Sequence, residues 1–154
     1  MSESFKIRVI GSSDLDVQCP MINVIVRVSI VDATAGELIQ KSELDQKCVS
    51  PYEETQYISP VATKGVKLIN LKKLSANWKE DFIYNEPIST ILSNDVIIFF
   101  EIMDTFIHSD RHSVTPITWA FLRLKPRDEC RYLSRVSKLQ LYYYPNNFDV
   151  NLKC

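Results

Sequence analysis

DVIIFFEIMD, at residues 95–104, is the stretch that decides the fold. It is dense in the β-branched and aromatic residues that favour strands. Between residues 96 and 103 both faces of an extended strand would be apolar, and Glu101 carries the only charge there. Such a strand is typical of the middle of a sheet that is covered on each side. We therefore predict a central, doubly covered strand whose two faces carry, respectively, Val96, Ile98, Phe100 and Ile102, and Ile97, Phe99 and Met103.

Two more strand-like runs follow, TPITWAFLRL at 115–124 and SKLQLYYYP at 137–145. In the first, residues 117, 119 and 121 alternate with 118, 120 and 122 between the two faces of a strand. In the second, Leu139, Leu141 and Tyr143 alternate with polar or aromatic residues, and Pro145 ends the run. The connections between the runs are polar and turn-prone. The sequence from Asp95 to Pro145 therefore predicts three strands.

Earlier in the chain, period-two alternation predicts strands at 5–9, 22–30, 37–41, 55–61 and 78–84. Residues 66–74 favour one or two helical turns, and Pro87 suits the start of a short helix over 87–92. Short strands with turn signals about every 10 residues are typical of a sandwich. We predict an all-β fold, an eight-stranded antiparallel β-sandwich with one or two short helices in the connections.

The composition narrows the class of protein. A chain of 154 residues is expected to form one domain, and a net charge of −1 gives no overall attraction to nucleic acid or anionic membranes. No secretory signal and no apolar stretch long enough to span a membrane is found, so we expect a soluble intracellular protein. We interpret the four cysteines as free thiols. Two disulfides are the alternative.

The sequence offers no catalytic apparatus. Only His108 and His112 could act as a base, and they fall in what we predict to be a polar loop, without a Gly-x-Ser-x-Gly elbow. The chain has three glycines, too few for a phosphate-cradling loop. The two histidines would ligate a metal only if that loop were helical, and we interpret them as solvated.

The aspartates of the sequence make calcium the metal to consider. Four aspartates in two predicted loops could converge at one end of a sandwich, and calcium takes oxygen ligands of this kind. The spacing is loose, however, and ordinary turn aspartates explain the same residues. We expect no metal, with weak calcium candidates at Asp14, Asp16, Asp104 and Asp110.

Basic and tyrosine side chains are the candidates for binding a partner. One basic group is Lys64, Lys67, Lys72 and Lys73, and the second is Arg123, Lys125, Arg127, Arg131, Arg135 and Lys138. They could bind acidic protein segments or lipid headgroups, or simply solvate strand ends. In the run of three tyrosines at 142–144 at least one must face outward, to bind a partner or to cover a sheet edge. Our partner-binding candidates are Tyr142, Tyr144, Arg123, Arg127, Arg131, Arg135, Lys72 and Lys73.

An ordered set of motifs resembles a C2 domain. The set is Trp78-x-Glu80-x-Phe82, Phe99-Phe100-Glu101-Ile102-x-Asp104, Trp119-Ala120-Phe121-Leu122 and Leu139-Gln140-Leu141-Tyr142-Tyr143-x-Pro145. The resemblance runs from about Val24 to Pro145. More specifically, the sequence looks like the C2-like region of a ciliary transition-zone and basal-body protein. It implies a single C2-like domain over residues 1–145 and a C-terminal tail over 146–154. The chain lacks that protein's β-propeller repeats and SH3 region, so it is either a single-domain relative or a fragment.

The resemblance and the missing catalytic groups together predict a function. We expect a calcium-independent, non-catalytic scaffold or docking module in a cilium, axoneme or basal body. Its partners would be other ciliary or cytoskeletal proteins, with tubulin among the candidates. The alternative is a peripheral lipid-binding C2 domain that contacts anionic membranes through basic loops. We expect no cofactor, no nucleic acid and no small-molecule substrate.

Overall fold

The computed structural model describes residues 4–13, 15, 21–42, 56–68, 75–108, 111–125 and 136–144, with only the backbone described at 22, 106–108, 111 and 112. All eight strands in these residues pair antiparallel, and the only helical element is one short 3-10 turn. In chain order the elements are β1 (Phe5–Ser12), β2 (Met21–Asp32), β3 (Val61–Ala62), β4 (Val66–Leu68), β5 (Ala76–Tyr84), η1 (Ile88–Thr90), β6 (Val96–His108), β7 (Arg111–Leu122) and β8 (Tyr142–Tyr143).

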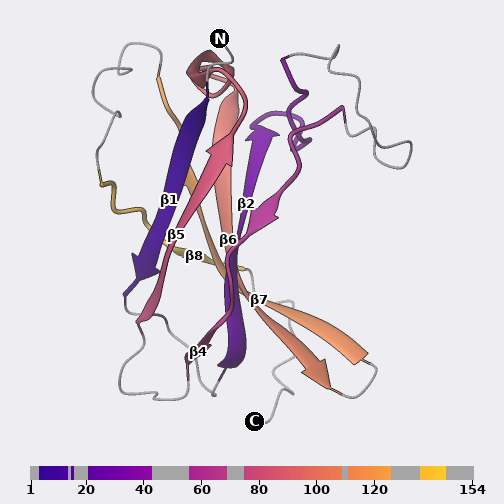
Figure 1. Cartoon of the computed structure of the whole chain (residues 1–154), viewed down its shortest axis with the longest axis vertical. Helices are drawn as coiled ribbons and strands as arrows, with labels where there is room; N and C mark the ends of the chain where they lie inside the picture. Colours follow the sequence, from indigo (N-terminus) through magenta and orange to yellow (C-terminus); the bar gives the residue numbers. More distant parts are fainter. Residues whose placement is uncertain are drawn as a thin grey trace.

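The strands form two sheets that pack face to face. One sheet has two strands, β1 and β5, and the other has six, in the order β3-β2-β6-β7-β8 with β4 also paired to β2. Figure 1 shows β1 and β5 side by side, with the long strands β2, β6 and β7 running through the other layer. The predicted all-β antiparallel sandwich is confirmed.

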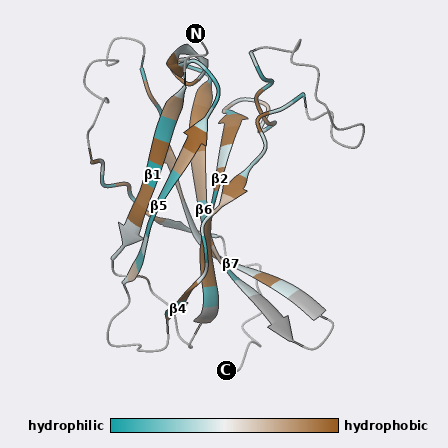
Figure 2. Ribbon diagram, in the orientation of Figure 1, coloured by the Kyte–Doolittle hydropathy of each residue, from teal (hydrophilic) through white to brown (hydrophobic). Residues whose placement is uncertain are grey.

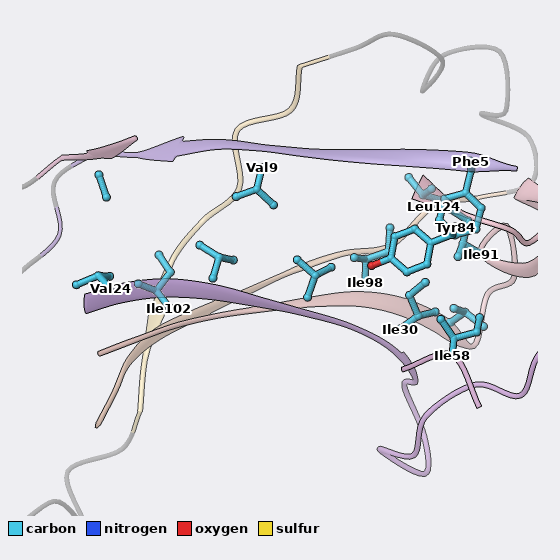
Figure 3. Close-up of a cluster of buried hydrophobic side chains, with 14 of the residues drawn as sticks. Phe5, Val9, Val24, Ile30, Ile58, Tyr84, Ile91, Ile98, Ile102 and Leu124 are labelled. Atoms are coloured by element: carbon cyan, nitrogen blue, oxygen red, sulfur yellow. The ribbon is translucent and has the colours of Figure 1, made fainter. Parts of the chain in front are cut away.

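The core lies between the two sheets. β2 supplies four buried residues at every second position, which is the alternation seen in the sequence: Val24, Val26, Val28 and Ile30. Figure 3 shows Phe5 and Val9 of β1 facing Ile98 and Ile102 across the space between the layers. At the margin of the core, the Trp78 Nε1–H donates a hydrogen bond to the carbonyl oxygen of Val24 at 3.0 Å. The period-two pattern in β2 therefore encodes which face is buried.

β6 is the central strand of the large sheet, as predicted, and it is apolar along much of its length (Figure 2). Its inner face is buried at Val96, Ile98 and Ile102. On its outer face Phe99 and Glu101 are only half-buried. The prediction that both faces are covered is therefore wrong at these two positions, because β1 and β5 pack on the opposite, inner face of the large sheet.

Several local predictions need correction. The strands predicted over 37–41 and 55–61 are present, in the described residues, only as isolated bridges at Leu38, Gln40 and Tyr57 and as the start of β3 at Val61. Residues 66–68 form β4 against β2 and not a helical turn, and the short helix over 87–92 is the single 3-10 turn η1. The strand over 139–143 is reduced to the two residues of β8. The predicted polar loop around His108 and His112 is strand, because β6 and β7 stay paired out to His108 and Arg111.

Candidate functional site

Four aromatic rings gather on the outer face of the large sheet. Trp119 of β7 lies at their centre, with ring centroids 4.7 Å from Tyr142, 5.7 Å from Phe99 and 6.2 Å from Phe121. Phe121 and Tyr142 are 6.1 Å apart. We call Phe99, Trp119, Phe121 and Tyr142 the aromatic surface.

The strand register places these rings together. Phe99 lies directly opposite Phe121 on β6 and β7, and Trp119 lies directly opposite Tyr142 on β7 and β8. Directly opposed residues of an antiparallel pair project from the same face, as do residues two apart on one strand. All four side chains therefore project from the same face of the large sheet.

A buried hydrogen bond holds β8 in place beneath the aromatic surface. Thr118 is 0% exposed, and its hydroxyl donates to the carbonyl oxygen of Tyr142 at 2.6 Å. This hydrogen bond from Thr118 of β7 thus fixes the backbone that carries the Tyr142 ring. The stacking of Tyr142 on Trp119 depends on this short strand staying paired.

The aromatic surface is open to solvent at its edge. Phe121 is 40% exposed and Tyr142 is 41% exposed, while Phe99 and Trp119 are half-buried. Clustered, partly exposed aromatic side chains are typical of protein interfaces. This cluster is therefore the strongest candidate for a binding site in the described part of the chain.

A polar network adjoins the rings. Glu101 lies opposite Trp119 in the sheet, and its Oε2 accepts a hydrogen bond from Arg27 Nε at 2.7 Å. The same oxygen forms an ion pair with Arg27 Nη2 at 2.6 Å. The Tyr144 hydroxyl donates to Glu101 Oε1 at 3.2 Å. Desolvation, followed by the charge of Glu101, raises the pKa of Tyr144 to about 12, so this hydroxyl keeps its proton. Both carboxylate oxygens of Glu101 are therefore already engaged.

Cationic side chains lie just beyond the end of β7. Arg123 follows Phe121 by two residues and is exposed, and Lys125 is exposed as well. Neither side chain forms an ion pair with the residues that the structure describes. This end of the aromatic surface therefore carries positive charge that is not neutralised within those residues.

Of the four candidate calcium residues, the structure describes Asp104. Asp104 lies within β6 and not in a loop, is 9% exposed, and accepts a hydrogen bond from the Asn23 backbone N–H at 2.9 Å. Asp14, Asp16 and Asp110 lie outside the described residues. No group of three potential metal ligands occurs among the residues described. The calcium hypothesis stays a prediction.

The structure places only some of the predicted partner residues. Tyr142 is in the aromatic surface, Tyr144 is tied to Glu101 beside it, and Arg123 is at its end. Outside the described residues lie Arg127, Arg131, Arg135, Lys72 and Lys73. Sequence reasoning missed Phe99, Trp119 and Phe121 as binding residues. The alternation of 117–122 already put Trp119 and Phe121 on one face, and that face turns out to be the outer one.

In the parts of the chain described here, we find no helix of the length and apolar character needed to cross a membrane.

Comparison with known proteins finds that the chain is similar to jouberin from two species. The chain is 29% identical to mouse jouberin over 150 residues and 30% identical to rat jouberin over 151 residues. Each match covers 86% of this chain but only 14% of the relative, so the chain spans about one seventh of the length of the curated proteins it matches. No protein-family model matches the chain. The chain is similar to one region of jouberin over most of its own length.

Proposed function

We propose that this chain is a non-catalytic C2-type docking module that binds a protein partner through the aromatic surface, in a cilium, axoneme or basal body. The observation that carries the proposal is the cluster of four rings on the outer face of the large sheet. Tryptophan and tyrosine are enriched among the residues that dominate binding energy at interfaces. Trp119 lies half-buried at the centre of the cluster, and Tyr142, stacked on it, is 41% exposed.

The rigidity of the site favours docking. Phe99, Trp119, Phe121 and Tyr142 are carried by paired strands and not by loops, and a hydrogen bond from Thr118 fixes β8. Preorganised aromatic side chains lose little conformational entropy on binding. The surface is therefore suited to recognise a partner without rearranging.

The ciliary placement comes from similarity. The ordered motifs from Trp78 to Pro145 resemble a C2-like region of a ciliary protein, and the chain is similar to jouberin over 86% of its length. The partners we propose are accordingly ciliary or cytoskeletal proteins. We propose calcium-independent binding because the carboxylate of Asp104 is already bonded to the Asn23 backbone.

Proximity labelling in ciliated cells tests the proposal. The chain fused to a biotin ligase is expected to label ciliary or basal-body proteins, and Tyr142→Ser or Phe121→Ser is expected to lose most of them. Ile83→Ser is the matched control, because Ile83 is 71% exposed on β5, in the other sheet. Equal labelling by all four proteins would contradict the use of the aromatic surface, and labelling outside the cilium would contradict the placement.

Anionic membrane binding is the second candidate function, favoured by the exposed Arg123 and Lys125. Flotation with phosphatidylserine vesicles at low salt, with and without calcium, separates it from docking because low salt strengthens surface electrostatics. Binding that Arg123→Glu abolishes and Tyr142→Ser leaves intact would favour the membrane.

A further inference from the structure

We propose that the aromatic surface binds an extended, proline-rich segment of a partner protein, with an acidic side chain of that segment placed against Arg123. The inference rests on the proposed docking function and specifies the chemistry of the partner. Three observations support it. They are the arrangement of the four rings, the hydrogen-bonding groups of Trp119 and Tyr142, and the positive charge of Arg123 at one end of the aromatic surface.

The arrangement of the rings limits what can bind. Trp119 and Tyr142 are stacked with an angle of 26° between their planes, so each covers a face of the other. Phe121 is stacked on both of them, at 27° to Trp119 and 18° to Tyr142. Recognition of a nucleobase needs an open ring face. Stacking covers one face of each ring, and the ring surface that stays exposed can pack against small apolar rings, which proline supplies.

The hydrogen-bonding groups of the surface are unbalanced. Within the described residues, Trp119 Nε1 and the Tyr142 hydroxyl make no hydrogen bond, and neither is among the buried unpaired atoms, which are Ser12 Oγ and Tyr84 Oη. The nearby acceptor, Glu101, is occupied by Arg27 and Tyr144. The surface thus offers two donors, Trp119 Nε1 and the Tyr142 hydroxyl, and its charged acceptor is already occupied.

A polyproline II segment has the opposite balance. Proline has no N–H, and the carbonyl groups of this extended helix make no internal hydrogen bonds, so they are available to donors. Aromatic-lined surfaces with tryptophan or tyrosine donors are a recurring way to bind such segments. The charge of Arg123, unpaired among the described residues, favours a carboxylate near one end of the segment.

A second copy of the chain fits less well. In a two-fold dimer each surface faces an identical one. The two Arg123 guanidinium groups would then lie in the same interface, without a carboxylate from either copy's occupied Glu101. The same surface is complementary to an acceptor-rich, acidic segment.

The test is fluorescence anisotropy of the whole chain with a fluorescein-labelled oligoproline peptide flanked by glutamates. One control probe has lysines in place of the glutamates, and a second has alternating glycine and serine in place of the prolines. We expect binding of the first probe, and affinity weaker by about tenfold or more in Tyr142→Ser and in Phe121→Ser. Ile83→Ser should bind like the unchanged chain, and Arg123→Glu should reverse the preference between glutamate and lysine probes.

Several results would overturn the inference. These are failure of the glutamate–proline probe to bind a chain with unchanged circular dichroism, equal binding of the glycine–serine probe, or equal binding by Tyr142→Ser and Phe121→Ser. Dimerisation lost in Tyr142→Ser, or phosphatidylserine vesicles that displace the probe, would assign the surface to another occupant. If the probe fails while ciliary labelling still depends on Tyr142, the proline-rich partner is excluded and the docking function stands. If both fail, both proposals are wrong.

Discussion

Thr118→Val tests whether β8 holds the aromatic surface together. The substitution keeps the β-branched shape but removes the hydroxyl that donates to the Tyr142 carbonyl oxygen at 2.6 Å. Thr118 is 0% exposed, so the added methyl group of valine fills the place of the hydroxyl and the Tyr142 carbonyl loses this donor. A buried hydrogen bond of this kind contributes about 1 kcal/mol net, and leaving its partner unsatisfied raises the cost to about 1–3 kcal/mol.

We expect Thr118→Val to lower the free energy of unfolding by about 1–2 kcal/mol, which corresponds to a fall in Tm of about 2–8 °C for a chain of this size. Chemical denaturation and thermal scans followed by circular dichroism measure it. Amide hydrogen exchange at Tyr142 and Tyr143 should accelerate, because β8 pairs only through these residues in the described chain. Thr34→Val, the same chemical change in an exposed turn, is the control.

An unchanged Tm together with unchanged exchange in β8 would refute this reasoning. A loss of stability without faster exchange in β8 would show that the hydroxyl stabilises the core and not the strand that carries Tyr142.

Three other predictions concern the frame around the site. Gly65→Ala should destabilise the fold by about 1–3 kcal/mol, because the added Cβ would overlap with Asn23 Oδ1. The cost of Gly65→Ala should be smaller in an Asn23→Ala background. Chemical denaturation of the four proteins of this double-mutant cycle measures both effects. Hydrogen bonds from Arg8 lower the pKa of Asp81 to about 2. Because that pKa is depressed on folding, its stabilising effect is present above about pH 4 and is lost as the pH falls towards about 2. Asp81→Asn should remove this part of the acid dependence, and NMR titration of the carboxyl group checks the pKa. Gly36→Ala should cost about 1 kcal/mol through its φ of +70° alone, since nothing lies within 4 Å of the added methyl group; a Gly36→Asn variant with a larger loss of Tm would contradict the backbone explanation.

Much of the fold follows from alternation in the sequence. In β2 the apolar residues occur at every second position, and these same positions are buried between the sheets. Register is strongly specified where one face is buried, since a one-residue slip would expose every apolar side chain of the strand. This is why the strands at β2 and β6 could be predicted from their residues.

The errors fall where side chains carry little periodic information. β4 has three residues, too few to tell a strand from a helical turn, and only its pairing with β2 defines it. The residues around His108 and His112 are polar, and from the sequence alone we expect a loop there. Backbone hydrogen bonds between β6 and β7 continue there nonetheless, because strand pairing does not require apolar side chains.

The binding surface was predictable only in part. The three tyrosines signalled a contact residue at the C-terminal end, and Tyr142 is exposed as expected. Tyr144 is instead tied to Glu101, which no local pattern predicts because the two residues are 43 positions apart. The role of Trp119 depends on which face of the large sheet β1 and β5 cover, and that is a property of the assembled sandwich.

Site-specific photo-crosslinking in ciliated cells tests the central claim most directly. A photoreactive benzophenone amino acid would replace Phe121 on the aromatic surface, or Ile83 on the other sheet, in the otherwise unchanged chain. We expect covalent capture of a ciliary partner from position 121, lost when Tyr142→Ser is added, and none of that partner from position 83. Capture from position 83 and not from 121 would contradict it.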